Sequence, residues 1–207
     1  MAFQRDYVLR MIEMMGDLLR RLKMLGTDLL RQMELDAACR DQCGLPLDAA
    51  ADLSRDTLAE LLPPRALFVL SELLYLKLSS TAMDADAEMQ MKMHILRILS
   101  SLHEEETLCE ERGRRLRELM DDCDDEMTPE DYLNCARFFL AGEHLTDCED
   151  AVFMAVEIAL DKKAPIRQGK EMLQQMLHLP ETTLIPGGMT REEIRTAIDD
   201  LETWEKA

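Results

Sequence analysis

The sequence predicts an all-α protein, and three features of its composition and patterning support this fold class. Residues that lose little side-chain freedom in a helix, such as Leu, Met, Ala and Glu, are abundant, with 16 Met among 207 residues. Aromatic residues, which favour strands, make up only 4%. Hydrophobic residues make up 47% and recur at steps of three and four, the spacing of one helix face.

The first predicted helix, residues 3–25, carries a long apolar stripe that continues to residue 29. Its members are Tyr7, Met11, Met14, Leu18, Leu22, Leu25 and Leu29. A second row beside it consists of Val8, Ile12, Met15 and Leu19. Two rows widen the apolar face, so this helix should pack on more than one neighbour. Gly26 and Thr27 supply a stop and a new N-cap, and a second helix is expected to reach Cys43.

Proline and glycine mark the limits of the helices in the middle of the chain. Gly44 and Pro46 end the second helix, and Pro63 follows a short third one. The helices expected here span residues 54–62, 65–79, 84–102 and 104–122. The acidic run 121–126 is expected to be a solvated turn, because it lacks the Gly and the spaced ligands of a calcium loop.

In the last third of the chain, capping residues mark where two of the helices begin. Thr128 can cap a helix, Pro129 suits its first position, and the acids that follow complement the helix dipole. Residues 190–193 form a capping box for the final helix. The helices expected here span residues 128–141, 147–162, 165–178 and 190–204, with a turn at 186–188. The whole chain should therefore contain nine or ten helices.

The chain is acidic, and most of its net charge of −18 lies near the C-terminal end. Residues 121–207 carry 8 basic and 21 acidic residues, a net charge of −13. Such a surface repels phosphate backbones and anionic lipids, so we expect neither a nucleic-acid nor a membrane partner. If this third of the chain binds a partner, a basic one is favoured; the alternative is that the charge serves only solubility.

The cysteines and the N-terminal sequence predict a cytoplasmic location. The six cysteines include no Cys-x-x-Cys motif and no spacing typical of a disulfide framework, which suits free thiols in a reducing compartment. No apolar signal segment follows Met1. The most apolar stretch, residues 67–78, is shorter than the ~20 residues that a membrane span needs.

No motif in the sequence places catalytic or ligand-binding residues together. His103 begins a sequence like the zinc-protease helix motif, but Thr107 stands where the second His is needed. The chain has no Glu-x-x-His, P-loop or Gly-x-Ser-x-Gly pattern. Two pairs at a spacing of four could each supply two zinc ligands, Cys39 with Cys43 and His144 with Cys148. Packing is favoured for these thiols, so we predict a non-enzymatic protein without catalytic, cofactor-binding or metal-binding residues.

Two further clusters each allow two interpretations. Four arginines could clamp an acidic peptide or a phosphate, but neighbouring glutamates are placed to neutralise them. These arginines are Arg112, Arg114, Arg115 and Arg117. The Met-rich segment 83–93 could form an adaptable binding surface, although core packing is favoured. Trp204 should anchor the last helix against the core.

Residues 132–155 resemble a degenerate tetratricopeptide repeat. The large, small and aromatic positions of that family's first helix are matched by Tyr132, Ala136 and Phe139. Its turn is matched by Gly142-Glu143, and the small positions of its second helix by Cys148 or Ala151 and by Ala155. The resemblance implies a right-handed stack of antiparallel helix hairpins, although the repeat period is not sustained along the chain.

The whole chain also resembles a family of uncharacterised bacterial all-helical proteins, which open like residues 4–13 and close like residues 184–193. We predict a single helical domain that can be subdivided as 1–62, 63–126 and 127–207. The expected function is that of an interaction or scaffold protein, which binds a peptide or partner helix in a groove between helix hairpins. The alternative is a structural homo-oligomer assembled through the N-terminal apolar helix. An enzyme with a site assembled from scattered residues is the third interpretation.

Overall fold

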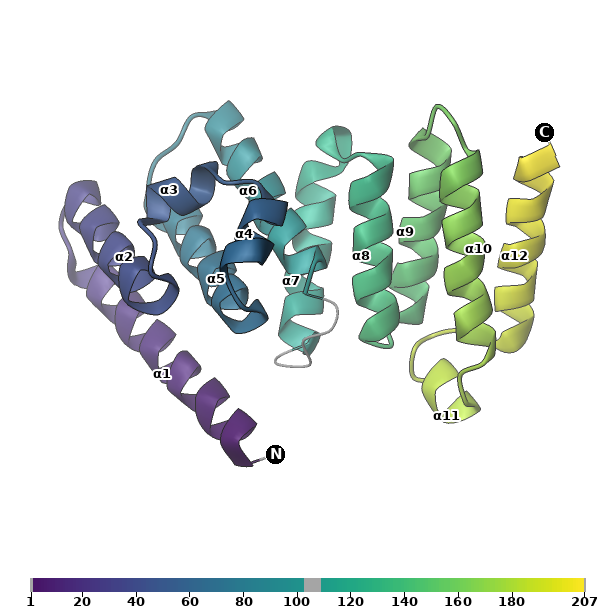
Figure 1. The fold of residues 1–207 in the computed structure, drawn as a ribbon, viewed down its shortest axis with the longest axis horizontal. Coiled ribbons are helices and arrows are strands. Elements are labelled where there is room, and N and C mark those ends of the chain that lie inside the picture. The colour runs from purple at the N-terminus through teal and green to yellow at the C-terminus, as the bar shows by residue number, and fades with distance from the viewer. Residues whose placement is uncertain (1, 103–108, 207) are drawn as a thin grey trace. The chain divides into compact units, whose positions relative to one another are not determined.

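The computed structural model describes residues 2–102 and 109–206, with the side chains of 10–102 and 110–206. Every regular element in these ranges is a helix, so the all-α prediction is confirmed. The α-helices are α1 (Ala2–Met24), α2 (Asp28–Cys43), α3 (Leu47–Asp52), α4 (Arg55–Leu61), α5 (Pro64–Ser80), α6 (Ala85–Ser100), α7 (Cys109–Cys123), α8 (Pro129–Ala141), α9 (Leu145–Ile158), α10 (Lys163–Leu177), α11 (Glu181–Leu184) and α12 (Arg191–Lys206) (Figure 1). None of these helices combines the length and the apolar content that a membrane span requires.

The described residues contain twelve α-helices, more than the nine or ten expected. The short helices α3 and α11, of six and four residues, were missed because one turn of helix leaves no apolar stripe in the sequence. Helix α9 ends at Ile158, before its predicted end at residue 162, and α10 begins at Lys163 rather than at Pro165. Pro165 therefore lies in the first turn of α10, where its missing N–H breaks no helical hydrogen bond.

The acidic run 121–126 is solvated, as the sequence predicted, because five of its six residues are exposed, but it is helical and not a free turn. Its first residues complete α7, which ends at the fully buried Cys123, and its last three form a 3₁₀ turn, η1 (Asp124–Glu126). Asp124 accepts a hydrogen bond from the hydroxyl group of Tyr132 on α8. This hydrogen bond links the exposed run to the following helix. The sequence from His103 to Thr107 lies outside the described residues.

The chain divides into two compact units, Met1–Ile98 and Leu99–Ala207. In the first unit α5 is the central helix: α2 packs along it, and α1, α3 and α4 also contact it. Its buried residues are Leu67, Phe68, Val69, Leu70, Ser71, Leu73 and Leu74. This burial explains the apolar character of the helix predicted at 65–79. The proposed subdivision at residues 62 and 126 stays a prediction.

The two apolar rows of α1 have different surroundings in the first unit. In the first row Met11, Leu18 and Leu22 are buried, with exposed fractions of 6%, 0% and 2%. In the second row Ile12 and Leu19 are 49% and 40% exposed. Leu29, the last member of the first row, belongs to α2 and is 66% exposed. Met11, Leu18 and Leu22 are therefore part of the monomer core, and Ile12 and Leu19 are accessible to another molecule.

In the second unit α8 and α9 form an antiparallel hairpin, with α10 packed against both and α12 against α10 (Figure 1). Helix α8 begins with the predicted cap, in which Thr128 and Asp131 hydrogen-bond to each other's backbone N–H. In the turn after α8, Glu143 has a left-handed φ of 61°, whereas Gly142 has a φ of −84°. The hairpin lies where the sequence predicted it; its relation to tetratricopeptide repeats and the handedness of the stack stay predictions.

Candidate functional site

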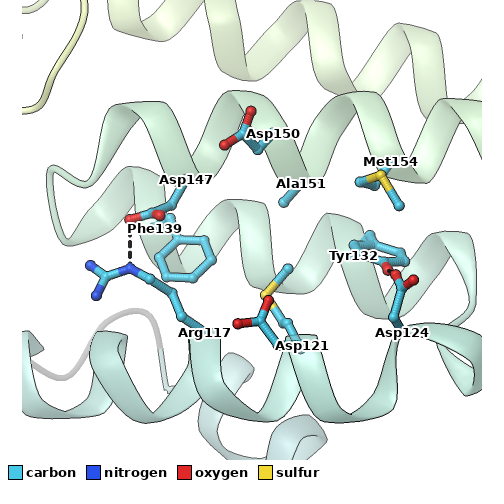
Figure 2. A pocket seen from close by; sticks show the side chains of 10 residues that line it. Arg117, Asp121, Asp124, Tyr132, Phe139, Asp147, Asp150, Ala151 and Met154 are labelled. Atoms are coloured by element: carbon cyan, nitrogen blue, oxygen red, sulfur yellow. Dashed lines mark hydrogen bonds and ion pairs between the residues drawn. The ribbon is translucent and has the colours of Figure 1, made fainter.

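A groove of about 460 Å³ lies between α7 and α9 in the second unit, and α8 forms its floor. One wall consists of Arg117, Met120 and Asp121 of α7, followed by Asp124 of η1. The other wall consists of Asp147, Asp150, Ala151 and Met154 of α9, and the floor of Tyr132 and Phe139 of α8 (Figure 2). The groove is therefore acidic along both walls. Tyr132 and Phe139 are only 2% and 1% exposed, so its apolar surface comes mainly from the half-buried Met120 and Met154.

Two hydrogen-bonded pairs lie at opposite ends of the groove (Figure 2). At one end Arg117 Nε donates to Asp147 Oδ2 at 2.9 Å, which joins α7 to α9. At the other end the hydroxyl group of Tyr132 donates to Asp124. Burial raises the pKa of Tyr132 and the hydrogen bond to Asp124 raises it further, so the phenol is protonated at neutral pH.

The middle of the groove lies between two carboxylates on opposite walls, Asp121 and Asp150. Burial raises the pKa of Asp150, and the nearby charge of Asp147 raises it further. A cation bound beside Asp150 would oppose both effects, because an opposite charge favours the ionised carboxylate. Met120 and Met154 add apolar surface next to these charges. The arrangement suits a ligand that is both cationic and partly apolar.

The predicted arginine cluster is divided among different environments. Arg112 is buried, with its guanidinium 5.3 Å from the centroid of the Phe138 ring. Arg114 is on the surface and lies 2.6 Å from Glu118. Arg117 contributes to the groove through its bond to Asp147, as described above. These arginines therefore do not form the single anion clamp that the sequence allowed.

The two pairs considered as zinc ligands lie in packed surroundings. The thiols of Cys39, Cys43 and Cys148 are buried, and His144 stands edge-on to Phe139 with ring centroids 6.3 Å apart. Burial raises the pKa of Cys148 to about 12, which keeps this thiol protonated. In the parts of the chain that the structure describes, no three His, Cys, Asp or Glu side chains are grouped so that they could hold a metal ion.

The remaining predicted residues have separate positions. Trp204 stands edge-on to Phe153 of α9, with ring centroids 5.6 Å apart, and Lys162 lies 5.0 Å from the Trp204 ring. The last helix is thus held partly by an aromatic pair. In the Met-rich segment, Met93 is buried, whereas Met83 and Met91 line a cavity of the first unit that is described below.

Sequence reasoning did not find the groove, although one signal was present. On α9 the lining residues Asp147, Asp150, Ala151 and Met154 follow helical spacing, and on the opposite wall Asp121 and Asp124 are three residues apart. Each set marks one helix face. That the two faces oppose each other across α8 depends on tertiary packing, which a single sequence does not contain.

Comparison with known protein families assigns the chain to one family. A family model matches residues 2–206. The chain belongs to DUF6483, a family of unknown function. This confirms the resemblance to an uncharacterised family that both ends of the sequence predicted, while bacterial origin stays a prediction. No curated protein and no solved structure matched the chain. Membership of DUF6483 assigns no activity.

Proposed function

We propose that this protein is a non-enzymatic interaction module that binds a basic peptide segment in the groove between α7 and α9. The observation that carries the proposal is one open groove whose two walls are both acidic and also present the half-buried side chains of Met120 and Met154. Lys and Arg side chains have an apolar stem and a charged end, so they match a groove that offers both kinds of surface.

The charges in the groove favour a cationic partner. Four carboxylates line it, together with one guanidinium group, that of Arg117. Asp147 is bound to Arg117, and Asp124 accepts the hydroxyl of Tyr132. Asp121 and Asp150 are therefore the carboxylates best placed to bind an incoming Lys or Arg. Such a contact would also relieve the repulsion that raises the pKa of Asp150.

The same groove gives less support to catalysis. The described residues that line it include no Cys, Ser, Thr or His, so a Ser–His or Cys–His pair of nucleophile and base is not available there. Tyr132 is held protonated by burial and by its bond to Asp124, which makes it a poor base. Binding is therefore the function that the groove supports best.

Fluorescence anisotropy with a labelled Lys/Arg-rich peptide tests the proposal. The double variant Asp121→Asn/Asp150→Asn should weaken binding about tenfold, which corresponds to ~1.4 kcal/mol. The control Glu181→Gln/Asp199→Asn removes the same charge from exposed positions outside α7, α8 and α9 that do not line the groove. It should change the affinity less than about twofold at physiological salt, because distant exposed charges are screened. Equal losses in both variants would show non-specific attraction and overturn the proposal.

A second function, assembly into a homo-oligomer, is favoured by the exposed row of α1. Ile12 and Leu19 lie seven residues apart on one helix face and are 49% and 40% exposed. Ile12→Glu/Leu19→Glu should reduce the mass measured by light scattering while the helical circular dichroism is unchanged. Leu18→Glu is unsuitable for this test because Leu18 is in the core. A wild-type protein that is monomeric at every concentration would exclude this function.

A further inference from the structure

A second cavity, of about 440 Å³, lies within the first unit. Its lining comes from α2, α3, α5, α6 and the connection between α5 and α6. The residues with hydrogen-bonding or ionic groups that matter here are Asp48, Asp52, Lys77, Thr81 and His94. The groove proposed to bind a peptide belongs to the other unit, and the two sites share no residue.

Two buried polar atoms belong to residues that line this cavity. His94 Nε2 and Thr81 Oγ1 make no hydrogen bond with any described residue. Among the side-chain nitrogen and oxygen atoms buried in the described parts of the chain, these are the two without such a bond. Burying a polar atom without a partner costs stability, so folded proteins usually provide one. Their presence at one cavity points to a ligand that hydrogen-bonds to both.

The chemistry of His94 determines what such a ligand must offer. Burial lowers the pKa of His94, so the imidazole is neutral at pH 7. His94 also forms a hydrogen bond with the backbone of Ala50, which raises its pKa. A bond that raises the pKa is one that the imidazole ring donates. Because Nε2 is the nitrogen without a partner, the ring proton is on Nδ1 and Nε2 presents a lone pair. The ligand must therefore bring an N–H or O–H donor.

The ionic groups of the cavity favour a cation as that donor. Asp48 and Asp52 supply two carboxylates and Lys77 one ammonium group, and Lys77 Nζ lies 2.6 Å from Asp48 Oδ1. The charge of Arg97, which does not line the cavity, lowers the pKa of His94, and the charge of Asp52 raises it. Among the residues that line the cavity, Asp52 is thus a second carboxylate near the imidazole. Met83 and Met91 line the same cavity and supply a polarisable apolar wall.

We infer that this cavity binds a small primary alkylammonium ion. The ammonium group would donate to Asp52, to His94 Nε2 and to the Thr81 hydroxyl, and the alkyl chain would lie along Met83 and Met91. An ammonium group carries three N–H donors and no acceptor, so it satisfies three acceptors at once. A neutral alcohol has one donor and lacks the charge that Asp52 attracts.

Methyl NMR of the full chain with ¹³C-labelled methionine methyl groups tests this inference, because two methionines line the cavity. Butylamine is titrated against 1-butanol, which has the same chain without the charge. Met83→Leu and Met91→Leu assign the two signals. Butylamine should shift both methyl signals to saturation, and 1-butanol should not. Equal shifts with the two compounds, or shifts that never saturate, would overturn the inference.

Substitution of the ionic partner decides the role of the charge. Asp52→Asn should weaken butylamine binding about fivefold or more, because it removes the paired charge. Glu60→Gln, an exposed carboxylate on α4 that does not line the cavity, is the matched control and should bind like the wild type. His94→Phe should also weaken binding. If His94→Phe does not fold, Asp52→Asn decides the question, because Asp52 is exposed and its substitution leaves the core unchanged. Wild-type affinity in Asp52→Asn would overturn the inference.

Discussion

Arg117 on α7 and Asp147 on α9 lie 2.9 Å apart, and their ion pair joins the two walls of the groove at one end. The two side chains are 37% and 29% exposed. A partly exposed pair of this kind contributes only ~0.2–1 kcal/mol to stability. Its larger effect is on the charge of the groove, because Arg117 neutralises a carboxylate that would otherwise be available to a basic ligand.

Arg117→Ala should therefore separate stability from binding. We expect the free energy of unfolding in urea to fall by less than ~1 kcal/mol. The affinity for a Lys/Arg-rich peptide should rise about threefold or more, because the substitution removes a repulsive charge and releases Asp147. Arg114→Ala, which removes an exposed arginine paired with Glu118 outside the groove, is the control. Weaker peptide binding by Arg117→Ala alone would contradict the proposed site.

Asp150→Asn should stabilise the protein at neutral pH. Because the pKa of Asp150 is raised in the folded state, ionised Asp150 lowers stability above that pKa. The penalty disappears as the pH falls below the ordinary carboxyl pKa, where the side chain is protonated in both states. Thermal unfolding should therefore give a higher Tm for Asp150→Asn than for the wild type at pH 7, and equal values near pH ~3. A lower Tm at pH 7 would show that the carboxylate is needed for folding.

Thr128→Ala should weaken the start of α8. The Thr128 hydroxyl accepts from the backbone N–H of Asp131 at 3.2 Å, and Asp131 accepts from the backbone N–H of Thr128 at 3.1 Å. Loss of a capping side chain costs ~1 kcal/mol, with a range of roughly 0.5–2. Urea denaturation followed by Trp204 fluorescence would measure this. Thr128→Ser keeps the hydroxyl and should stay close to the wild type.

Gly169→Ala should be destabilising because α9 and α10 cross closely at this glycine. A Cβ atom at residue 169 would lie 2.4 Å from Cγ1 of Val152. Overpacking of this kind costs ~1–3 kcal/mol. Gly16→Ala is the matched control: it is also in a helix, but its Cβ would meet nothing within 4 Å, so it should stabilise by ~0.5–1 kcal/mol.

The double variant Gly169→Ala/Val152→Ala tests the assigned contact. If the clash with Val152 causes the loss, the double variant should be more stable than the sum of the two single effects predicts. The free energies of unfolding of all four proteins in urea provide the comparison. Strict additivity would mean that the destabilisation arises elsewhere in the crossing.

The fold class and most long helices were predictable because their signals are local. The start of α8 follows from Thr128 and Pro129, and the burial of α5 follows from its nearly continuous apolar run. The role of each row on α1 was not predictable, because Leu18 and Leu19 are equally apolar and only packing decides which one is buried. The extent of α9 was overestimated because its last predicted residues continue a helical composition without a stop signal.

The candidate sites were harder to predict than the helices. Asp121 and Asp150 are 29 positions apart in the sequence. They line the same groove because their helices, α7 and α9, both contact α8. His94 gave no signal of its own, since a lone His on an apolar helix is usually a packed side chain. Its significance depends on the state of one nitrogen atom, which only the surroundings reveal.

The two aromatic residues beneath the groove tie its shape to the core of the second unit. Tyr132 and Phe139 are 2% and 1% exposed, and their helix, α8, contacts both α7 and α9. A smaller residue at either position would leave a cavity in the core and cost ~3–5 kcal/mol of stability. The carboxylates of Asp121 and Asp150 are exposed and can be exchanged without that cost. Binding preferences within DUF6483 should therefore diverge through the charges on the walls while the aromatic residues stay the same.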